Sequence, residues 1–191
     1  MAIKTFTTGE VLTAADTNTY LANSGLVYIT EANPNGVASV SINNCFSATF
    51  NAYRIVWIPT AYSFAGQTQT FMRLRVGGTD NANNNYLRSR FYYGAGGLSG
   101  TDGGATAGDR WDFADTNTVL HPLSVDVYSP FQSFKSSAGS KAVSYQGAGN
   151  TLYGIETVGI TTVTTSYDGF SWFASNGTFT GKLLVYGYRQ A

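Results

Sequence analysis

The chain has 191 residues, of which 12% are charged and 15% are aromatic, and its 11 basic and 11 acidic side chains balance to a formal net charge of zero. The aromatic content excludes a disordered chain, and the lack of a basic run argues against nucleic acid as a partner. The single cysteine, Cys45, excludes an intrachain disulfide, and no apolar run is long enough for membrane insertion.

A helix is predicted near the start of the chain and nowhere else. Thr13 is a suitable N-cap, with Asp16 three residues later to complete an acidic form of the capping box. Tyr20 and Leu21 extend the helix, and Gly25 is a natural stop. A helix of about three turns is marginal alone in water. It therefore needs a surface to dock on: the protein's own β domain, a neighbouring copy or a larger assembly.

The rest of the chain predicts strands. They are expected at residues 26–30, 37–42, 46–58, 70–76, 86–93, 118–128, 131–136, 141–146 and 153–165. The clearest alternation is in 70–76, where Met72 and Leu74 point one way and Arg73 and Arg75 the other. In 46–58 the second half carries apolar residues on both sides and is expected to be buried on both faces.

Two stretches rich in turn residues separate these strands. Seven of the fifteen residues in 94–108 are glycine, which predicts a displayed loop. Asn176-Gly177, between two aromatic and β-branched runs, predicts a hairpin closed by a type I′ turn. The chain is long enough for one domain with a small N-terminal element. We expect an N-terminal segment at 1–28 with the short helix. An all-β, antiparallel β-sandwich domain, jelly-roll-like, is expected at 29–191.

The string FTTGEVLTAADTNTYLANSGLVY, residues 6–28, resembles the N-terminal segment of small β-rich structural proteins of tailed bacteriophages. These are tail-fibre-like, minor tail or head-decoration proteins. A weaker likeness continues in FNAYRIVWI, MRLRVGGTDNANNNYLRS and GTFTGKLLVYGYR. The resemblance implies attachment to other virion proteins through Thr13, Asp16, Tyr20 and Leu21, a homotrimer, and a place on the virion after synthesis in the host cytoplasm.

The residues for catalysis are sparse. One histidine, His121, and one cysteine cannot build a zinc site, and no nucleophile or phosphate-binding motif is present. We therefore expect no enzyme, no metal and no cofactor. The carboxylates of Asp102, Asp109, Asp112 and Asp115 gather around the glycine-rich stretch, where a pair could flank a glycosidic bond. Turn formation is the favoured role for them.

Ligand binding is a better-supported expectation. Trp111 lies among charged residues on a predicted loop, which gives an apolar surface beside polar groups, as sugar binding requires. The predicted ligand-binding residues are Asp109, Arg110, Trp111, Asp112, Tyr92 and Tyr93. The competing interpretation is a tryptophan that pins the loop to the body or fills a subunit interface.

A local cluster of basic residues also has two possible roles, ion pairing or phosphate binding. It consists of Arg73, Arg75, Arg88 and Arg90 on two predicted strands. Pairing with the scattered carboxylates is favoured over phosphate binding.

Three functions remain open at this point. The first is a structural virion protein, either a tail-fibre or tail-tip appendage that binds a host-surface glycan or a capsid decoration protein. The second is a lectin-like carbohydrate-binding module. The third is a depolymerase, which would need the carboxylate pair.

Overall fold

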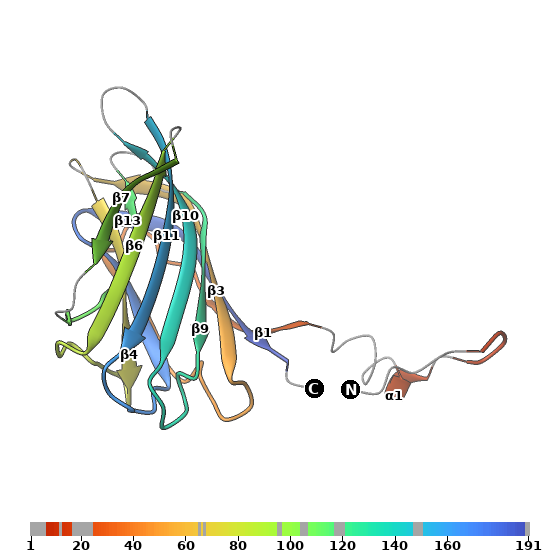
Figure 1. Cartoon of the computed structure of the whole chain (residues 1–191). Coiled ribbons are helices and arrows are strands. Elements are labelled where there is room, and N and C mark those ends of the chain that lie inside the picture. Colours follow the sequence, from red (N-terminus) through yellow and green to blue (C-terminus); the bar gives the residue numbers. More distant parts are fainter. Residues whose placement is uncertain are drawn as a thin grey trace.

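The computed structural model describes residues 7–11, 13–16, 25–64, 66, 68–94, 97–103, 107–116, 121–146 and 151–189. These residues form one helical turn and thirteen strands (Figure 1). The elements are α1 (Ala14–Asp16), β1 (Leu26–Ala32), β2 (Ser39–Ile42), β3 (Ala52–Ser63), β4 (Thr68–Val76), β5 (Thr79–Asp80), β6 (Tyr86–Gly94), β7 (Gly97–Gly103), β8 (Trp111–Thr116), β9 (Leu123–Tyr128), β10 (Ser137–Gln146), β11 (Thr151–Thr161), β12 (Gly169–Ala174) and β13 (Thr178–Tyr188).

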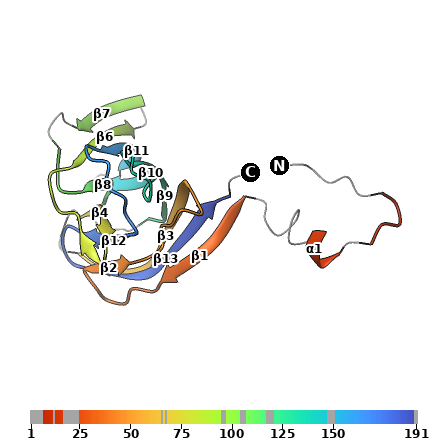
Figure 2. The ribbon, with the colours of Figure 1, turned by 90° about the horizontal axis from the view of Figure 1, so that it is seen from below.

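The strands form two antiparallel sheets. The large sheet has eight strands in the order β1-β13-β3-β9-β10-β11-β6-β7. The small sheet has the order β2-β12-β4-β5, and β8 also pairs with β4. Seen end-on in Figure 2, the large sheet curves along one side of the body, and β8, β4, β12 and β2 lie on the other. The expected all-β chain with two antiparallel sheets is confirmed.

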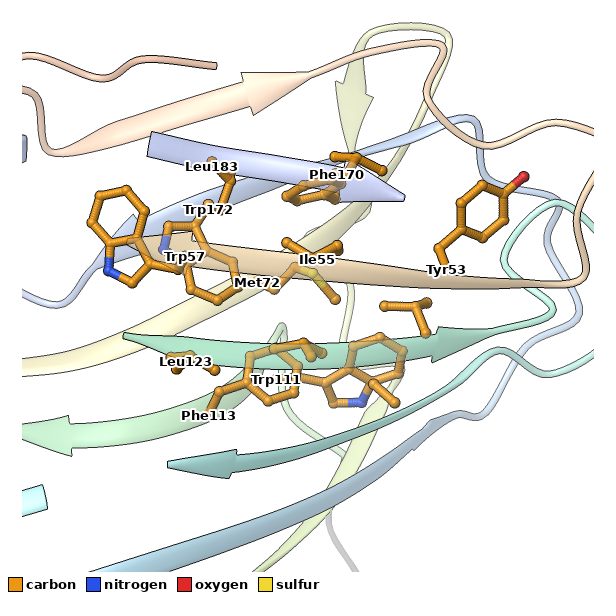
Figure 3. Close-up of a cluster of buried hydrophobic side chains, with 14 of the residues drawn as sticks. Tyr53, Ile55, Trp57, Met72, Trp111, Phe113, Leu123, Phe170, Trp172 and Leu183 are labelled. Atoms are coloured by element: carbon orange, nitrogen blue, oxygen red, sulfur yellow. The ribbon is translucent and has the colours of Figure 1, made fainter. Parts of the chain in front are cut away.

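Aromatic side chains from both sheets fill the core between them (Figure 3). Trp57 of β3 and Trp172 of β12 approach across the layers, with ring centroids 6.4 Å apart. Phe113 of β8 stacks on Trp172 at 6.1 Å. Full burial of such a side chain contributes about 1.5–3 kcal/mol or more. The sequence correctly predicts the buried face of β3. The prediction that the second half of this strand is buried on both faces is wrong, because Ile58 on the outer side is 39% exposed.

The expected three-turn helix is not seen. The described residues near Thr13 hold a single turn, α1, and Tyr20 and Leu21 lie outside the described residues. A helix this short gains little without a surface to pack on, and the side chains described at 7–11 and 13–15 are exposed. Figure 1 shows α1 away from the strands of the body.

The sheet begins before the end of the predicted N-terminal segment. Leu26 pairs with Tyr188, and Tyr28 pairs with Tyr186, so β1 starts inside residues 1–28. The first and last strands of the chain therefore run side by side at one edge of the large sheet.

Two predicted assignments were wrong, a loop in the glycine-rich stretch and a strand at 131–136. The glycine-rich stretch contains strand β7, which pairs with β6 from Ser89 to Gly94. Backbone hydrogen bonds need no side chain, so a run of glycine beside a longer strand still pairs. Residues 131–136 form turns rather than a strand, after Ser129 takes a left-handed conformation with φ 55°.

The predicted hairpin at Asn176-Gly177 is also wrong. The flanking strands, β12 and β13, belong to different sheets. Gly177 has φ 71°, but Asn176 does not have positive φ, whereas a type I′ turn requires it at both positions. The two residues form a corner where the chain crosses from one sheet to the other.

Cys45 is a core residue, as predicted. Its side chain is 2% exposed, and burial raises the pKa of the thiol to about 12. A thiol with so high a pKa stays neutral and is a poor nucleophile at neutral pH.

Candidate functional site

The predicted ligand-binding residues separate into three places. Trp111 lies on β8 rather than on a loop, and it is 0% exposed. Its ring meets the edge of Tyr86 at 5.2 Å. Because Trp111 pairs with Met72 of β4, strand alternation points its ring into the core. The expected exposed position of this ring is therefore wrong, and the ring pins β8 to the body instead.

Tyr92 and Tyr93 lie on the other sheet and point to opposite sides of it. Tyr92 packs against the core, and Tyr93 is 43% exposed on the outer face of the large sheet. Consecutive residues of a strand face opposite ways. The structure thus does not bring these tyrosines together with the charged residues 109–112.

The charged residues 109–112 stay together beside β4 of the small sheet, and Asp112 among them is buried. The Asp109 carboxylate pairs with Arg73 and accepts a hydrogen bond from Arg110 at 2.8 Å. Asp112 is 2.7 Å from Arg88. Pairing of the basic cluster with carboxylates, the favoured prediction, is confirmed for Arg73, Arg75 and Arg88. The side chains of Asp102 and Asp115 lie outside the description, so the structure does not place the full predicted carboxylate group.

Beside these charges the small sheet carries a hollow of about 440 Å³, which we call the small-sheet hollow. It is lined by Ala38, Ser39, Ser41, Arg73, Arg75, Asp80, Ser171, Phe173 and Ala174. The hollow exists because the outward residues of β2 and β12 are mostly small, whereas neighbouring β4 projects long arginines. Serine and alanine thus form the floor, and Arg73, Arg75 and Phe173 form a wall.

A hydrogen-bond network fixes the polar part of this hollow. Arg75 pairs with Asp80 and donates to Ser171 Oγ at 2.7 Å and to Ser41 Oγ at 3.0 Å. Ser171 Oγ donates its one proton to Asp80 at 2.6 Å. The 2.8 Å contact between the two serine hydroxyls is then a bond donated by Ser41 to Ser171. The floor is rigid because each of these side chains is held by two others.

Two residues that line the hollow each keep a polar atom without a hydrogen bond from the described residues. Asp80 Oδ2 accepts no hydrogen bond from the described residues, since the network uses Oδ1. Arg73 uses Nε and Nη2 toward Asp109, which leaves Nη1 without a bond in the described part of the chain. The guanidinium of Arg73 lies 4.9 Å from the centre of the half-buried Phe173 ring. A residue with a free acceptor, one with a free donor and an aromatic ring therefore line the same hollow.

This arrangement suits binding of hydroxyl groups. A vicinal diol can donate to a carboxylate oxygen and accept from a guanidinium while its carbons rest on a ring. Over the described ranges no three His, Cys, Asp or Glu side chains converge as a metal site would need. His121 lies just before β9, and the structure assigns it no role.

The sequence does not predict most of the residues that line the hollow. The alternation in 70–76 predicts that Arg73 and Arg75 share a face, and the structure confirms it. Ser41 and Ser171 are 130 residues apart, and nothing local signals that their strands pair.

No protein-family model matches the chain, and no curated protein matches it. In the part of the chain that the structure describes, no helix is long and apolar enough to cross a membrane. Fold and site together define a two-sheet antiparallel β protein with a polar, ring-walled hollow on its small sheet.

Proposed function

We propose that the chain is a structural, non-enzymatic protein of a tailed-bacteriophage particle. It attaches through its N-terminal segment and displays its β body as a tail-fibre or tail-tip appendage that contributes to binding of a host-surface glycan. The observation that carries the binding role is the small-sheet hollow, where Asp80, Arg73 and Phe173 offer an acceptor, a donor and an apolar wall. The jelly-roll form of the sandwich belongs to the same proposal.

The exposed N-terminal residues support the attachment role. Val11 is 78% exposed, so an apolar side chain of this segment is accessible to a partner. Thr7 and Glu10 close a turn, with the Thr7 amide donating to Glu10 at 3.1 Å. A segment with local structure but no cover of its own is suited to dock on another protein.

Capsid decoration is the alternative placement, since the same exposed segment would serve on a head. A free lectin-like module is the second alternative. An antibody fragment against the body, imaged on intact particles by electron microscopy, separates the three. We expect label at the tail. Label over the head favours decoration, and particles without label favour the lectin.

Deleting residues 1–25 is expected to abolish incorporation into particles while the body stays folded, because β1 begins at Leu26 and keeps its pairing with β13. Incorporation is measured by immunoblot of purified particles, and folding by circular dichroism and thermal melting. Normal incorporation of the shortened chain would show that the N-terminal segment is not the anchor.

Filling the small-sheet hollow is expected to weaken glycan binding at least tenfold, about 1.4 kcal/mol. Ser39→Tyr places a ring over the floor from an exposed strand position that favours aromatic residues. Arg73→Lys tests the hydrogen-bond donor separately, since lysine keeps the positive charge but lacks the planar guanidinium with its fixed N–H donors. Binding is measured by calorimetry with purified host-surface polysaccharide.

The matched control is Ser63→Tyr, the same substitution at an exposed position on β3 of the large sheet. It should bind the polysaccharide as the unchanged protein does. If Ser39→Tyr and Ser63→Tyr bind equally well, the hollow is not the glycan site.

A further inference from the structure

The outer face of the large sheet carries a second feature, which the glycan hollow does not explain. Figure 1 looks onto this face, with β10 and β11 near its middle. The two strands pair antiparallel, and their outward residues form four cross-strand rows. The rows are Ser137 with Ile160, Gly139 with Val158, Lys141 with Glu156, and Val143 with Gly154.

Each row joins unlike partners. In three of them a small residue on one strand stands beside a large apolar one on the other, and in the remaining row a cation stands beside an anion. Val158 is 47% exposed, so it projects from the face. Over Gly139 lies a hollow of about 330 Å³. The large residue stands on β11 in the rows of Ile160 and Val158, and on β10 in the row of Val143.

We propose that a second copy of this chain packs on the β10–β11 face about a two-fold axis parallel to the strands. Such an axis, running between β10 and β11, places β10 of one copy over β11 of the other, row by row. Val158 of each copy then enters the hollow over Gly139 of its partner, and Val143 meets Gly154. Two sheets packed face to face lie about 10 Å apart, which lets outward side chains interdigitate.

The charges on the face also fit a second copy. Lys141 is 83% exposed and only 4.0 Å from Glu156 in its own chain. The two-fold arrangement brings each lysine over the partner's glutamate, so the contact forms two such pairs. A strongly acidic or strongly basic partner would need a face whose charges are all of the opposite sign. This face carries both in the same row, and the whole chain has no net charge to repel a copy.

The apolar surface and the size of the face are sufficient for a dimer. Large exposed side chains on this face and its neighbouring strands include Tyr128, Val143, Leu152, Val158, Ile160 and Tyr93. At about 4.8 Å per strand and 3.3 Å per residue, β9, β10, β11 and β6 cover on the order of 600 Å². Two copies would bury about 1,200 Å², the low end for specific interfaces.

A rigid polar group lines one side of the hollow over Gly139. Arg54 donates two hydrogen bonds of 2.8 Å to Asp126, and Tyr188 donates a third at 2.7 Å. Burial tends to raise the pKa of Asp126, but these bonds outweigh it and hold the pKa below its usual value. The hollow that would receive Val158 of the partner therefore has a fixed polar wall, beside the Lys141–Glu156 row.

The test is the mass of the full chain in solution by light scattering after size exclusion. We expect twice the 20.4 kDa of one chain. Lys141→Glu puts like charges opposite each other in both contacts, which should weaken the dimer about 100-fold or more. The double variant Lys141→Glu/Glu156→Lys restores opposite charges and should restore the dimer.

A steric variant and a charge control complete the design. Gly139→Leu fills the hollow, and a Cβ there meets nothing closer than 3.9 Å in its own chain, so the fold should persist while the dimer is lost. Lys182→Glu breaks a surface pair with Glu31 elsewhere on the sheet and should leave the mass unchanged. A single-chain mass for the unchanged protein, a three-chain mass, or a dimer that tolerates both Lys141→Glu and Gly139→Leu would overturn the proposal.

Discussion

Trp111→Ala is expected to lower the free energy of unfolding by about 3–5 kcal/mol. The indole is fully buried between the sheets, against Tyr86 and Phe113, and the surrounding strands cannot collapse into the space it would leave. Loss of the indole Nε1 adds little, because within the described residues that atom has no hydrogen-bond partner. The measurement is urea unfolding followed by circular dichroism.

The matched control is Tyr93→Ala, which removes a large ring from the outer face of the same body. Because Tyr93 is 43% exposed, its loss should change the unfolding free energy by less than about 1 kcal/mol. If Trp111→Ala left stability intact and abolished glycan binding, the ring would be a ligand contact, as the sequence alone suggested.

Strands are the part of the fold that sequence predicts best. The strands predicted at 70–76 and 86–93 reappear as β4 and β6, and Met72 and Leu74, predicted to share a face, are both buried. This works because a strand with one buried face must repeat every two residues, and that period is local. The buried rings of Tyr53 and Trp57 follow from the same rule.

Pairing between distant strands is what the sequence could not supply. The residues around Trp111 predict a loop because glycine precedes them, yet β8 is held by β4, about forty residues earlier in the chain. Likewise, Asn176-Gly177 has the composition of a hairpin, but each neighbouring strand finds its partners elsewhere. Local composition was overridden by burial in both places.

The candidate site shows the same division. Asp109 and Asp112 lie within one short stretch, and the structure keeps them near Arg73 and Arg88. The hollow beside them draws on residues 38–41, 73–80 and 171–174. Three separate stretches meet there only because β2, β12 and β4 are neighbours.

The two outer faces of the body would then serve different purposes. The small sheet presents the hollow proposed to bind glycan, and the large sheet presents the face proposed to meet a second copy. Pairing on the large sheet leaves the small-sheet hollow open in both copies. Two hollows on one assembly would strengthen binding to a repeating polysaccharide by raising the effective concentration of the second site.

Gly169→Ala is expected to destabilise the protein by about 3 kcal/mol. A Cβ at this position would lie 2.3 Å from the carbonyl oxygen of Ile42 and 2.9 Å from the Cα of Asn43. Both obstacles are backbone atoms of the chain at the end of β2, so no side-chain rotation relieves the overlap. The strands β2 and β12 would have to separate at this end, and the floor of the hollow lies between them.

The control is Gly100→Ala on β7, where the nearest atom to a new Cβ belongs to Tyr92 at 4.0 Å, an ordinary contact. There the same methyl group should change the unfolding free energy by less than about 1 kcal/mol, measured by urea denaturation. Because the loss at Gly169 loosens the β2–β12 pair, it should also weaken polysaccharide binding under conditions where the protein is still folded. Equal stability of the two variants would mean that β2 does not pack on β12 as closely as the structure shows.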